Sequence, residues 1–540
     1  MPTSARFALV TALAVAVAAR PEPSAAETAP QWRQVEIAFE ATAGVENPYL
    51  AVDAWVEFTH SGGTTIRRPA FWDGGRTWRV RFTSPHADGT WQWVARSQPT
   101  MQGLDGRAGQ LTATNGAPAS GSLLRMSPAG RNAVRADGST FFVVADTAWA
   151  LPFRATVEQA RVYAADRRAK GFNAALLMTV QPDMKADGPE DRTVHGGFGR
   201  GFADLPEGRL TRLNPEYFQH LDRLVDVLHE HGIVPIYQPV FHGFGWKGLS
   251  VAGLKVSPGE YARYCRYLVA RYGARPAMWL AGADGTGREP NVRPAGEEIA
   301  RADAYGQPSG IHYNPWQESN AHWDAAFFHF HLCQTGHGGD HRPERVAVMQ
   351  TRTPVRGVAN GEPTYEGMGN GRHGLGWWQG HEAWLNLTAG GTFGVFYGAA
   401  SLWQWRLDER EPGWGAWSSG PWGWRQALDL EGSRYPGLVG RALAGLDTAD
   451  MTPDLEVARA ARAVAKPGSF ALVYLPEGGG VHVMPWADQV PWRLMDAQTG
   501  EWLEEGVADK TKADPWMGPR LEFPAGRPVV LVMGSPRPEH

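Results

Sequence analysis

The sequence predicts an α/β fold in which a (β/α)8 TIM barrel is flanked by a small N-terminal and a small C-terminal β-sandwich. Three observations predict it. In the middle of the chain, short apolar runs alternate with amphipathic helical segments. Eight such runs can be counted there, which is the number of strands in a closed barrel of this type. Both ends of the chain instead alternate apolar and polar residues with a period of two, as the strands of a sandwich do.

Composition narrows the class of protein. The chain has 540 residues, enough for two or three domains, and 43% of them are hydrophobic, so a sizeable core can form. The formal net charge of -4 gives no sign of the basic surface that a nucleic-acid partner requires. The two cysteines, Cys265 and Cys333, cannot build a disulfide framework or a zinc cluster. Both stand in apolar surroundings, and we interpret them as inert packing residues.

Residues 1–26 have the pattern of a secretory signal peptide. Arg6 gives a positive start, and the apolar stretch from Phe7 to Ala19 has the length of a signal core. Small residues up to Ala26 precede the expected cleavage point. No other stretch is long and apolar enough to span a membrane. We therefore expect a secreted or periplasmic protein with no membrane span after cleavage.

The stretch 30–115 predicts the first sandwich. Alternating runs are separated by turn clusters rich in Gly and Asp, which is typical of short antiparallel strands. These runs cover 35–40, 54–58, 78–83 and 91–94. Such a domain could bind sugar, but we favour one that packs on the central domain and supports it.

The stretch 122–450 predicts the barrel. Thr156 suits the N-cap of its first helix, and Gly171 and Gly232 follow the ends of two helices. A doubly wound open sheet is the alternative fold. It is weakened because no Gly-rich phosphate fingerprint follows the first apolar run, and we expect no cofactor. The predicted strands are 141–145, 172–178, 233–240, 276–284, 310–314, 325–332, 355–362 and 392–397, and the clearest helices are 156–170, 215–231 and 261–272.

The stretch 453–540 returns to strand patterns and predicts the second sandwich. Its apolar runs cover 470–475, 481–484 and 529–533, and a hairpin turn is expected at 496–500.

Two of the predicted barrel strands end in a carboxylate. The fourth ends at Asp284 and the seventh at Glu362. The C-terminal strand ends of a barrel share one face, and retaining barrel glycosidases carry their acid/base and their nucleophile at these two strand numbers. A single acid at a strand end is by default a loop cap or a salt-bridge partner, but two at these positions form a stronger signal. If both are catalytic, their carboxyl groups should lie about 5 to 6 Å apart.

Several segments of 122–450 resemble the catalytic domain of the apiosidase-like glycoside hydrolases, a DUF4038-type barrel. This resemblance implies that Asp284 is the acid/base, that Glu362 is the nucleophile and that Asp146 contacts sugar hydroxyls. The N-terminal stretch resembles the DUF5060-type sandwich that precedes such barrels, and the C-terminal stretch resembles a collagen-binding-like domain. The matching barrel segments are ADTAW at 145–149, AKGFN at 169–173, PEYFQHLDRLVDVLHEHGI at 215–233, WLAGAD at 279–284, NGEPTYEG at 360–367 and WLNLTAGGTFGVFYGA at 384–399.

Other polar and aromatic residues are candidates for the same site. Glu366, four residues after Glu362, is the main rival for the role of nucleophile. The pair His329 and His331 forms an H-x-H pattern that a metal-dependent hydrolase could use, although a core or sugar-binding histidine is the favoured interpretation. Many of the 24 Trp stand in apparent loops, where a flat ring can stack on a sugar. The expected substrate-binding residues are Asp146, Trp149, His312, His331, Gln334, His337, Tyr365 and Trp403.

These observations predict a secreted retaining exo-glycosidase that acts on side chains of a plant or microbial polysaccharide, with a furanoside such as apiose as the candidate terminal sugar. Glu362 follows Asn360 and Gly361, a polar setting that suits an ionised nucleophile. Asp284 follows small residues, and a sugar bound over it would desolvate it, which suits an acid that stays protonated. Two alternatives remain: a carbohydrate-binding barrel without activity, and a metal-dependent hydrolase that uses His329 and His331.

Overall fold

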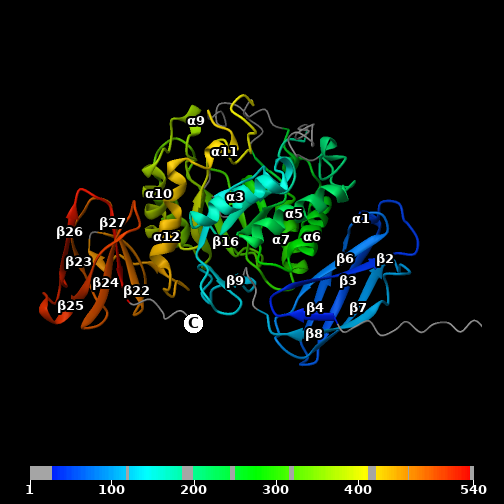
Figure 1. Ribbon diagram of the computed structural model, residues 1–540, viewed down its shortest axis with the longest axis horizontal. Helices are drawn as coiled ribbons and strands as arrows, with labels where there is room; N and C mark the ends of the chain where they lie inside the picture. Colours follow the sequence, from blue (N-terminus) through cyan, green and yellow to red (C-terminus); the bar gives the residue numbers. More distant parts are fainter. Residues whose placement is uncertain are drawn as a thin grey trace, which may run out of the picture.

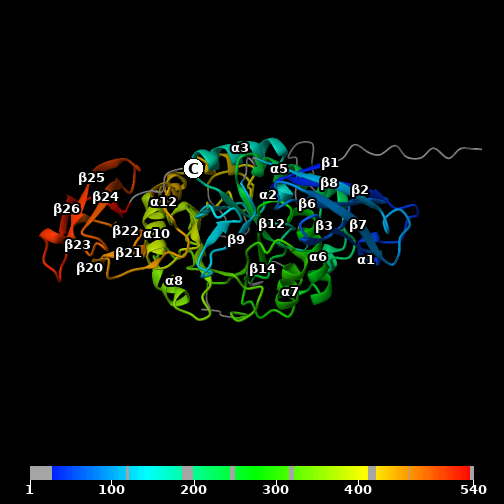
Figure 2. The same ribbon diagram turned by 90° about the horizontal axis from the view of Figure 1, so that it is seen from below.

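The computed structural model describes residues 27–116, 121–184, 199–243, 250–315, 321–411, 421–459 and 461–534. The chain forms an N-terminal β-domain (blue), a central α/β domain (cyan to yellow) and a C-terminal β-domain (orange to red), shown in Figure 1. The two β-domains lie on opposite sides of the central domain, and Figure 2 shows the same order from below. The predicted signal peptide lies outside the described residues. Within those residues, no helix combines the length and the apolar character needed to cross a membrane.

The central sheet confirms the predicted barrel. Its strands are parallel and follow the order β17-β16-β15-β14-β13-β12-β11-β18, so that the last strand pairs with the first. The remaining seam is bridged by a hydrogen bond of 3.1 Å from Phe393 N to Val358 O. The strands are β11 Val143–Thr147, β12 Ala174–Met178, β13 Val234–Gln238, β14 Met278–Gly285, β15 Ser309–Tyr313, β16 Phe330–Gln334, β17 Gly357–Glu362 and β18 Gly394–Tyr397.

Every residue of these strands is buried, because the barrel interior lies on one face of the sheet and helices cover the other. This explains their continuous apolar runs. One prediction was displaced: the sixth strand begins at Phe330, not at residue 325. Phe327 is buried against Gly296 of a neighbouring helix, where an added Cβ would lie 2.4 Å from the Phe327 ring. The apolar residues before β16 therefore lie in a loop that packs on a helix. A buried apolar run of this kind looks the same in the sequence as a buried strand.

The helices surround the barrel. Of the three with predicted bounds, α3 and α5 begin and end within one residue of them, whereas α6 begins at Pro258, three residues before its predicted start. Thr156 caps α3 with a reciprocal capping box, since its Oγ1 accepts from Gln159 N at 3.0 Å. Gly171 and Gly232 adopt positive φ angles of 87° and 71° after helix ends, a conformation that favours glycine. The helices are α2 Leu151–Arg154, α3 Val157–Ala169, α5 Pro215–Glu230, α6 Pro258–Tyr272, α7 Val292–Ala302, α8 Pro343–Gln350, α9 Met368–Gly371, α10 Trp377–Thr388, α11 Trp424–Ala427 and α12 Pro436–Leu443. Short 3-10 turns occur at Leu205–Glu207, Ala252–Leu254 and Glu431–Arg434.

A hairpin that the sequence did not reveal precedes the barrel. Its strands β9 (Leu124–Met126) and β10 (Ala133–Arg135) pair antiparallel. Asn132 in its turn donates a hydrogen bond of 2.9 Å from Nδ2 to Thr448 O. The two ends of the barrel segment are thereby joined. Strands of three residues carry too little alternation to be recognised in a sequence.

The N-terminal β-domain is a sandwich of two sheets with the orders β1-β8-β7-β3-β4 and β2-β6-β5. An ion network fixes it to the barrel helices α5 and α6. Asp222 of α5 accepts from Arg81 of the sandwich at 2.6 Å and from Arg271 of α6 at 2.8 Å. The elements are β1 Glu27–Pro30, β2 Gln34–Glu40, α1 Pro48–Ala51, β3 Asp53–His60, β4 Thr65–Pro69, β5 Phe71–Trp72, β6 Thr77–Thr83, β7 Thr90–Gln98 and β8 Ala108–Thr114.

The C-terminal β-domain consists of the sheets β19-β21-β22-β27-β24-β25 and β20-β23-β26. Its larger sheet packs on α10. Tyr474 of β22 stacks on Trp384 with ring centroids 5.9 Å apart, and its hydroxyl lies 2.7 Å from Nδ1 of His381. The elements are β19 Thr452–Pro453, β20 Ala458–Arg459, β21 Arg462–Lys466, β22 Phe470–Leu475, β23 Gly478–Val483, β24 Gln489–Asp496, β25 Trp502–Asp509, a 3-10 turn Lys510–Lys512, β26 Arg520–Ala525 and β27 Val529–Met533.

Candidate active site

A break in strand register sets the position of Asp284. Ala283 and Gly285 pair with two consecutive residues of β15, His312 and Tyr313, so that Asp284 is an extra residue in β14. Asp284 also has a positive φ of 61°, which is uncommon for a residue with a side chain. Such bulges redirect a side chain and occur often beside active sites. Asp284 is 2% exposed.

A second break in register precedes Glu362. The consecutive residues Cys333 and Gln334 of β16 pair with Asn360 and Glu362, so that Gly361 is the extra residue in β17. Only glycine fits there, because a Cβ on Gly361 would lie 2.6 Å from Leu332 Cβ. If β17 were regular through Gly361, with no break in register, Glu362 would face the same side as Asn360.

Asn360 faces the outer layer of the barrel. Its Nδ2 donates to Thr335 Oγ1 at 3.0 Å and to Glu382 Oε1, on α10, at 3.5 Å. Glu362 contacts other partners. Its Oε1 lies 2.8 Å from His337 Nε2, and its Oε2 lies 3.5 Å from His312 Nε2. Glu362 of β17 and Glu382 of α10 thus belong to separate groups of side chains.

Gln334 connects the two candidate catalytic acids. Its Nε2 donates a hydrogen bond to Oδ1 of Asp284, while its backbone pairs in register with Glu362. Tyr365 lies close to both acids: burial raises the pKa of its phenol well above the ordinary value, and the charges of Glu362 and Asp284 raise it further. The structure therefore brings together six of the predicted residues, namely Asp284, His312, Gln334, His337, Glu362 and Tyr365.

Burial determines the charge state of His312. It lowers the pKa of the imidazole, and the nearby Glu362 carboxylate only partly opposes this effect. His312 is therefore neutral at neutral pH. A neutral imidazole donates a hydrogen bond from one ring nitrogen and accepts one at the other, which suits recognition of a hydroxyl group.

Aromatic rings adjoin this group of polar side chains. Trp149 contacts Trp403 and Phe241 edge to face, with ring centroids 5.7 Å and 5.6 Å apart, and lies 6.2 Å from the His312 ring. The predicted Trp149 and Trp403 are thus brought to the site from the first and last barrel strands. Phe241, which follows β13, was missed, since one aromatic residue in an apolar run gives no separate signal.

The structure places Asp146 elsewhere, which corrects the expectation that it contacts sugar. Its Oδ2 accepts from Arg167 Nε, on α3, at 2.6 Å, and both side chains are fully buried. Side chains alternate along a strand, so that Asp146 faces the helix layer whereas its neighbour Thr147 faces the barrel interior. Thr147 is close enough to affect the pKa of Tyr365. Alternation along β11 could have identified Thr147 from the sequence.

His331 is also placed away from the acids, contrary to expectation. Its ring stacks on Tyr313 with centroids 4.5 Å apart and lies 5.7 Å from the Trp323 ring. Its strand neighbour Gln334 contacts Asp284 instead. His329 precedes β16, and its Nδ1 accepts from Ser309 N at 3.1 Å. In the described ranges, no three His, Cys, Asp or Glu side chains gather as a metal site would require.

Glu366, the rival of Glu362 for the role of nucleophile, is held by hydrogen bonds that connect parts of the fold. Its Oε1 accepts from Gly376 N at 2.8 Å and Gly432 N at 2.9 Å, and its Oε2 accepts from the Tyr397 hydroxyl at 2.6 Å. These donors join the loop after β17 to β18 and to the segment before α12. Burial raises the pKa of Glu366 although all three donors oppose the shift.

Two buried amides were missed by the sequence analysis. Gln238 ends β13 and Gln181 follows β12, and they are 0% and 1% exposed. Neither amide has a hydrogen-bond partner among the described residues. Gln238 faces the barrel interior, because its neighbour Tyr237 stacks on Tyr272 of α6 on the outer side. Both glutamines precede a proline at a strand end, in VQP and YQP, and this repeated pattern could have identified them.

Comparison with known structures agrees with this architecture. A protein of Bacteroides vulgatus provisionally described as a glycoside hydrolase has a TM-score of 0.70 at 17% identity, covering 94% of this chain and 99% of that one. A glycoside hydrolase family 5 protein of the same species gives 0.62 at 18% identity, with 76% and 93% covered. A third structure, described as a glycoside hydrolase, gives 0.61 at 19% identity, with 77% and 98% covered. At these identities the likeness concerns the fold. No curated protein matches the sequence significantly.

Two sequence families match the chain. A family described as a domain of unknown function, DUF5060, matches residues 28–98, which lie in the N-terminal sandwich. A family described as the apiosidase-like catalytic domain matches residues 127–450, more than half of the chain and the whole of the barrel. The predicted collagen-binding-like character of the C-terminal domain stays a prediction. The chain belongs to the apiosidase-like family, and it is a glycoside hydrolase.

Proposed function

We propose that this enzyme is a retaining exo-glycosidase in which Asp284 is the acid/base and Glu362 is the nucleophile. One observation carries the proposal. Two breaks in register, in the fourth and seventh barrel strands, direct these carboxylates to one group of side chains. Retention requires two carboxyl groups about 5 Å apart. The proximity of both acids to Tyr365 and their connection through Gln334 support a site that they share.

The proposed reaction has two steps. In the first, a carboxylate oxygen of Glu362 forms a bond to the anomeric carbon while the glycosidic C–O bond breaks, and Asp284 gives its proton to the leaving oxygen. In the second, Asp284 takes a proton from water as the water oxygen bonds to the anomeric carbon, which releases the sugar and the Glu362 carboxylate. His337, at 2.8 Å, holds the nucleophile in orientation. Tyr365 stays protonated and adds no further negative charge beside Glu362.

We further propose that the site holds the terminal sugar of a polysaccharide side chain. Trp149 and Trp403 supply apolar surface for one face of a ring. Gln181, Gln238 and the neutral His312 offer hydrogen bonds to hydroxyl groups, which a sugar has in excess over other small ligands. The family description supports apiose, a branched furanose, as the first candidate. A carbohydrate-binding barrel without turnover would be indicated if no glycoside in a broad chromogenic panel were hydrolysed.

The roles of the two acids are tested by paired alanine variants. Glu362→Ala should lose turnover for every leaving group, because no glycosyl-enzyme can form. Asp284→Ala should lose about 100- to 10,000-fold on substrates with poor leaving groups, but retain activity where the leaving group needs no proton. Azide should partly restore Asp284→Ala and give a glycosyl azide of retained configuration. If azide instead rescues only Glu362→Ala, an inverted glycosyl azide would still identify Glu362 as the nucleophile. A glycosyl azide of retained configuration from Glu362→Ala alone would show that the two roles are reversed.

Export is proposed as well, from the signal pattern of residues 1–26. Mass spectrometry of the mature protein should find a chain that begins near Glu27. A mature chain that retains Met1 would contradict the proposal.

A further inference from the structure

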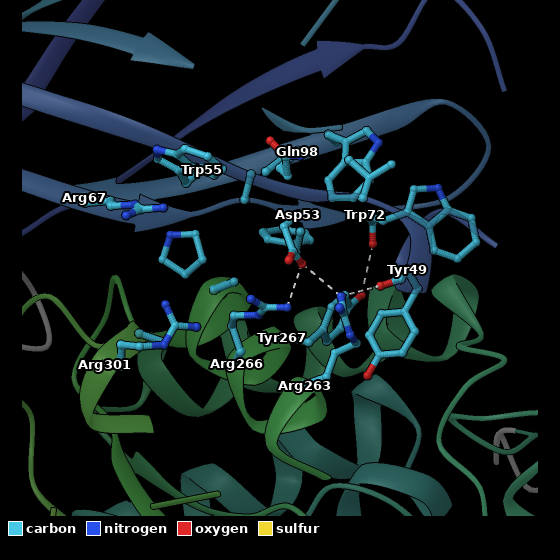
Figure 3. Close-up of a pocket in the computed structure, with 18 residues that line it drawn as sticks. Tyr49, Asp53, Trp55, Arg67, Trp72, Gln98, Arg263, Arg266, Tyr267 and Arg301 are labelled. Atoms are coloured by element: carbon cyan, nitrogen blue, oxygen red, sulfur yellow. Dashed lines mark hydrogen bonds and ion pairs between the residues drawn. The ribbon is translucent and has the colours of Figure 1, made fainter. Parts of the chain in front are cut away.

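A cavity of 340 Å³ lies between the N-terminal sandwich and the barrel, within the range of about 300 to 1,000 Å³ typical of ligand sites. Figure 3 shows Trp55 and Arg67 on the sandwich side and Arg263, Arg266 and Arg301 on the barrel side. The barrel wall is one face of α6 together with the end of α7. This cavity is therefore on the flank of the barrel, away from the C-terminal ends of its strands.

The walls of this cavity carry an excess of positive charge. Its four guanidinium groups, from the arginines named above, meet two carboxylates, Asp53 and Glu298. Asp53 accepts from Arg263 at 3.0 Å and from Arg266 at 2.7 Å. Glu298 accepts from Arg266 at 3.5 Å and pairs with Arg301 at 2.5 Å. Arg67 forms no ion pair in the described part of the chain, but Glu57 stands opposite it in the pairing of β3 with β4, so that one positive charge is left over.

Arg67 is held by an aromatic ring. Its Cζ lies 4.3 Å from the centroid of Trp55, whose Nε1 donates to Glu57 at 3.1 Å. The ring orients the guanidinium without neutralising it, because a cation–π contact leaves the N–H edge available for an anion. Trp72, on the same side of the cavity, is half-buried and offers a second flat surface.

The same domain interface contains a second ion network, part of which is more deeply buried. In the Arg81, Asp222 and Arg271 network, the Arg271 side chain is 0% exposed and that of Asp222 is 16% exposed. Asp53, although it binds two arginines, is 43% exposed. The pairs of Asp53 therefore lie beside a charged space that is open to solvent, whereas the pair of Arg271 and Asp222 does not.

We propose that this cavity binds an anionic saccharide, a sugar ring that carries a carboxylate or a sulfate ester, as an accessory site separate from the proposed catalytic centre. The guanidinium of Arg67 and that of Arg301 would take the anionic group from opposite walls by paired N–H donation. The ring of the sugar would lie against Trp55 and Trp72. We infer the negative charge of the ligand from the arginines of the cavity. We infer that the ligand is a saccharide from the family to which the chain belongs.

The test uses the full chain and equilibrium titration calorimetry. Wild-type protein is titrated with tetragalacturonate, with a sulfated galactose tetrasaccharide and with a neutral galactose tetrasaccharide. We expect at least one anionic probe to bind more tightly than the neutral one, and to bind more weakly as salt rises from 50 to 500 mM. Binding of the carboxylated probe alone identifies a uronate site, and binding of both identifies recognition of charge.

The variant Arg67→Ala/Arg301→Ala localises the binding. This double variant should bind the anionic probe at least tenfold more weakly than wild type. The control Arg293→Ala, on the same helix as Arg301 but outside the cavity, should bind like wild type. Hydrolysis of a small neutral glycoside should be unchanged in both variants, so that a failure of this proposal is distinct from a failure of the proposed mechanism. The proposal is overturned if neither anionic probe binds, if the neutral probe binds equally well, or if the double variant binds like wild type.

Discussion

The side-chain amide of Gln334 donates a hydrogen bond to the carboxylate of Asp284. A donor of this kind favours the ionised form of a carboxyl group. Gln334→Ala should therefore raise the pKa of Asp284 by about one unit. If Asp284 must be protonated to act, the alkaline limb of the pH–activity profile will move to higher pH by the same amount.

The measurement is kcat/KM against pH for wild type, Gln334→Ala and the surface control Gln110→Ala. An alkaline limb that stays in place in Gln334→Ala would show that another group sets it.

Gly361 allows β17 to shift register before the proposed nucleophile. In Gly361→Ala the new Cβ would meet Leu332 Cβ at 2.6 Å, so that either the strand or Leu332 must move. We expect a loss of stability of about 1 to 3 kcal/mol and a fall in kcat larger than the change in KM. Gly259→Ala is the matched control, since nothing lies within 4 Å of its Cβ position. Partial recovery in Gly361→Ala/Leu332→Gly, which removes the clashing Cβ of Leu332, would confirm that the clash is the cause.

Glu366 and Glu362 should respond differently to replacement by glutamine. The amide oxygen of Glu366→Gln can still accept from Gly376 N and Gly432 N, so that folding and most of the activity should persist. Glu362→Gln should be inactive but folded. Glu366→Ala should lose about 2 to 4 kcal/mol of stability, because it leaves buried donors without an acceptor. Chemical denaturation and single-substrate kinetics measure these effects, and an inactive but stable Glu366→Gln would return Glu366 to the list of catalytic candidates.

The ion pair of Asp146 and Arg167 should contribute to stability rather than to sugar binding. Asp146→Ala leaves Arg167 buried with only Asp166 as an ionic partner, at 2.6 Å. We expect a loss of about 3 kcal/mol, at the low end for a broken buried pair. Asp146→Asn should lose less. KM should stay within about twofold for both variants, which is a change too small to reflect a lost hydrogen bond to substrate. A stable Asp146→Asn with a strongly raised KM would instead show contact with the sugar.

His229 should make the barrel less stable in acid. Burial lowers the pKa of this imidazole to about 3, and Arg275 adds to the shift, whereas the unfolded chain titrates near 6.5. Between these values the unfolded state binds the extra proton, so that stability is lost as the pH falls below about 6.5. His229→Gln should reduce the slope of unfolding free energy against pH by about 1.4 kcal/mol per unit between pH 4 and 6. Urea denaturation at several pH values measures it, and an unchanged slope would contradict the expectation.

Strand and helix positions could be predicted because each barrel strand is buried on both faces and each long helix has its own capping residues. Thr156 and Gly171 mark the ends of α3 in the sequence as well as in the structure. The sixth strand was misplaced because Phe327 is buried by a helix rather than by the sheet. Short apolar runs report burial, and burial has more than one cause.

The direction of a side chain was harder to predict than its position. Asp146 stands at a strand end like Asp284, but β11 pairs regularly with both neighbours, whereas the register of β14 shifts at Asp284. A break in register depends on pairing with the next strand, and one chain segment read alone carries no trace of it. His331 lies in a regular part of β16, and there alternation fixes only that it faces opposite to Leu332, without telling which face is the inner one.

The contact of Tyr474 with Trp384 gives the larger C-terminal sheet two roles. One face builds the core of its own domain, and the other face, with Phe470 and Leu472, belongs to the same continuous core as the barrel. A chain cut after Met451 would expose Trp384 on α10, the helix that also carries Glu382. The C-terminal β-domain and the barrel are therefore expected to unfold together. Removing the C-terminal β-domain would expose part of the barrel core.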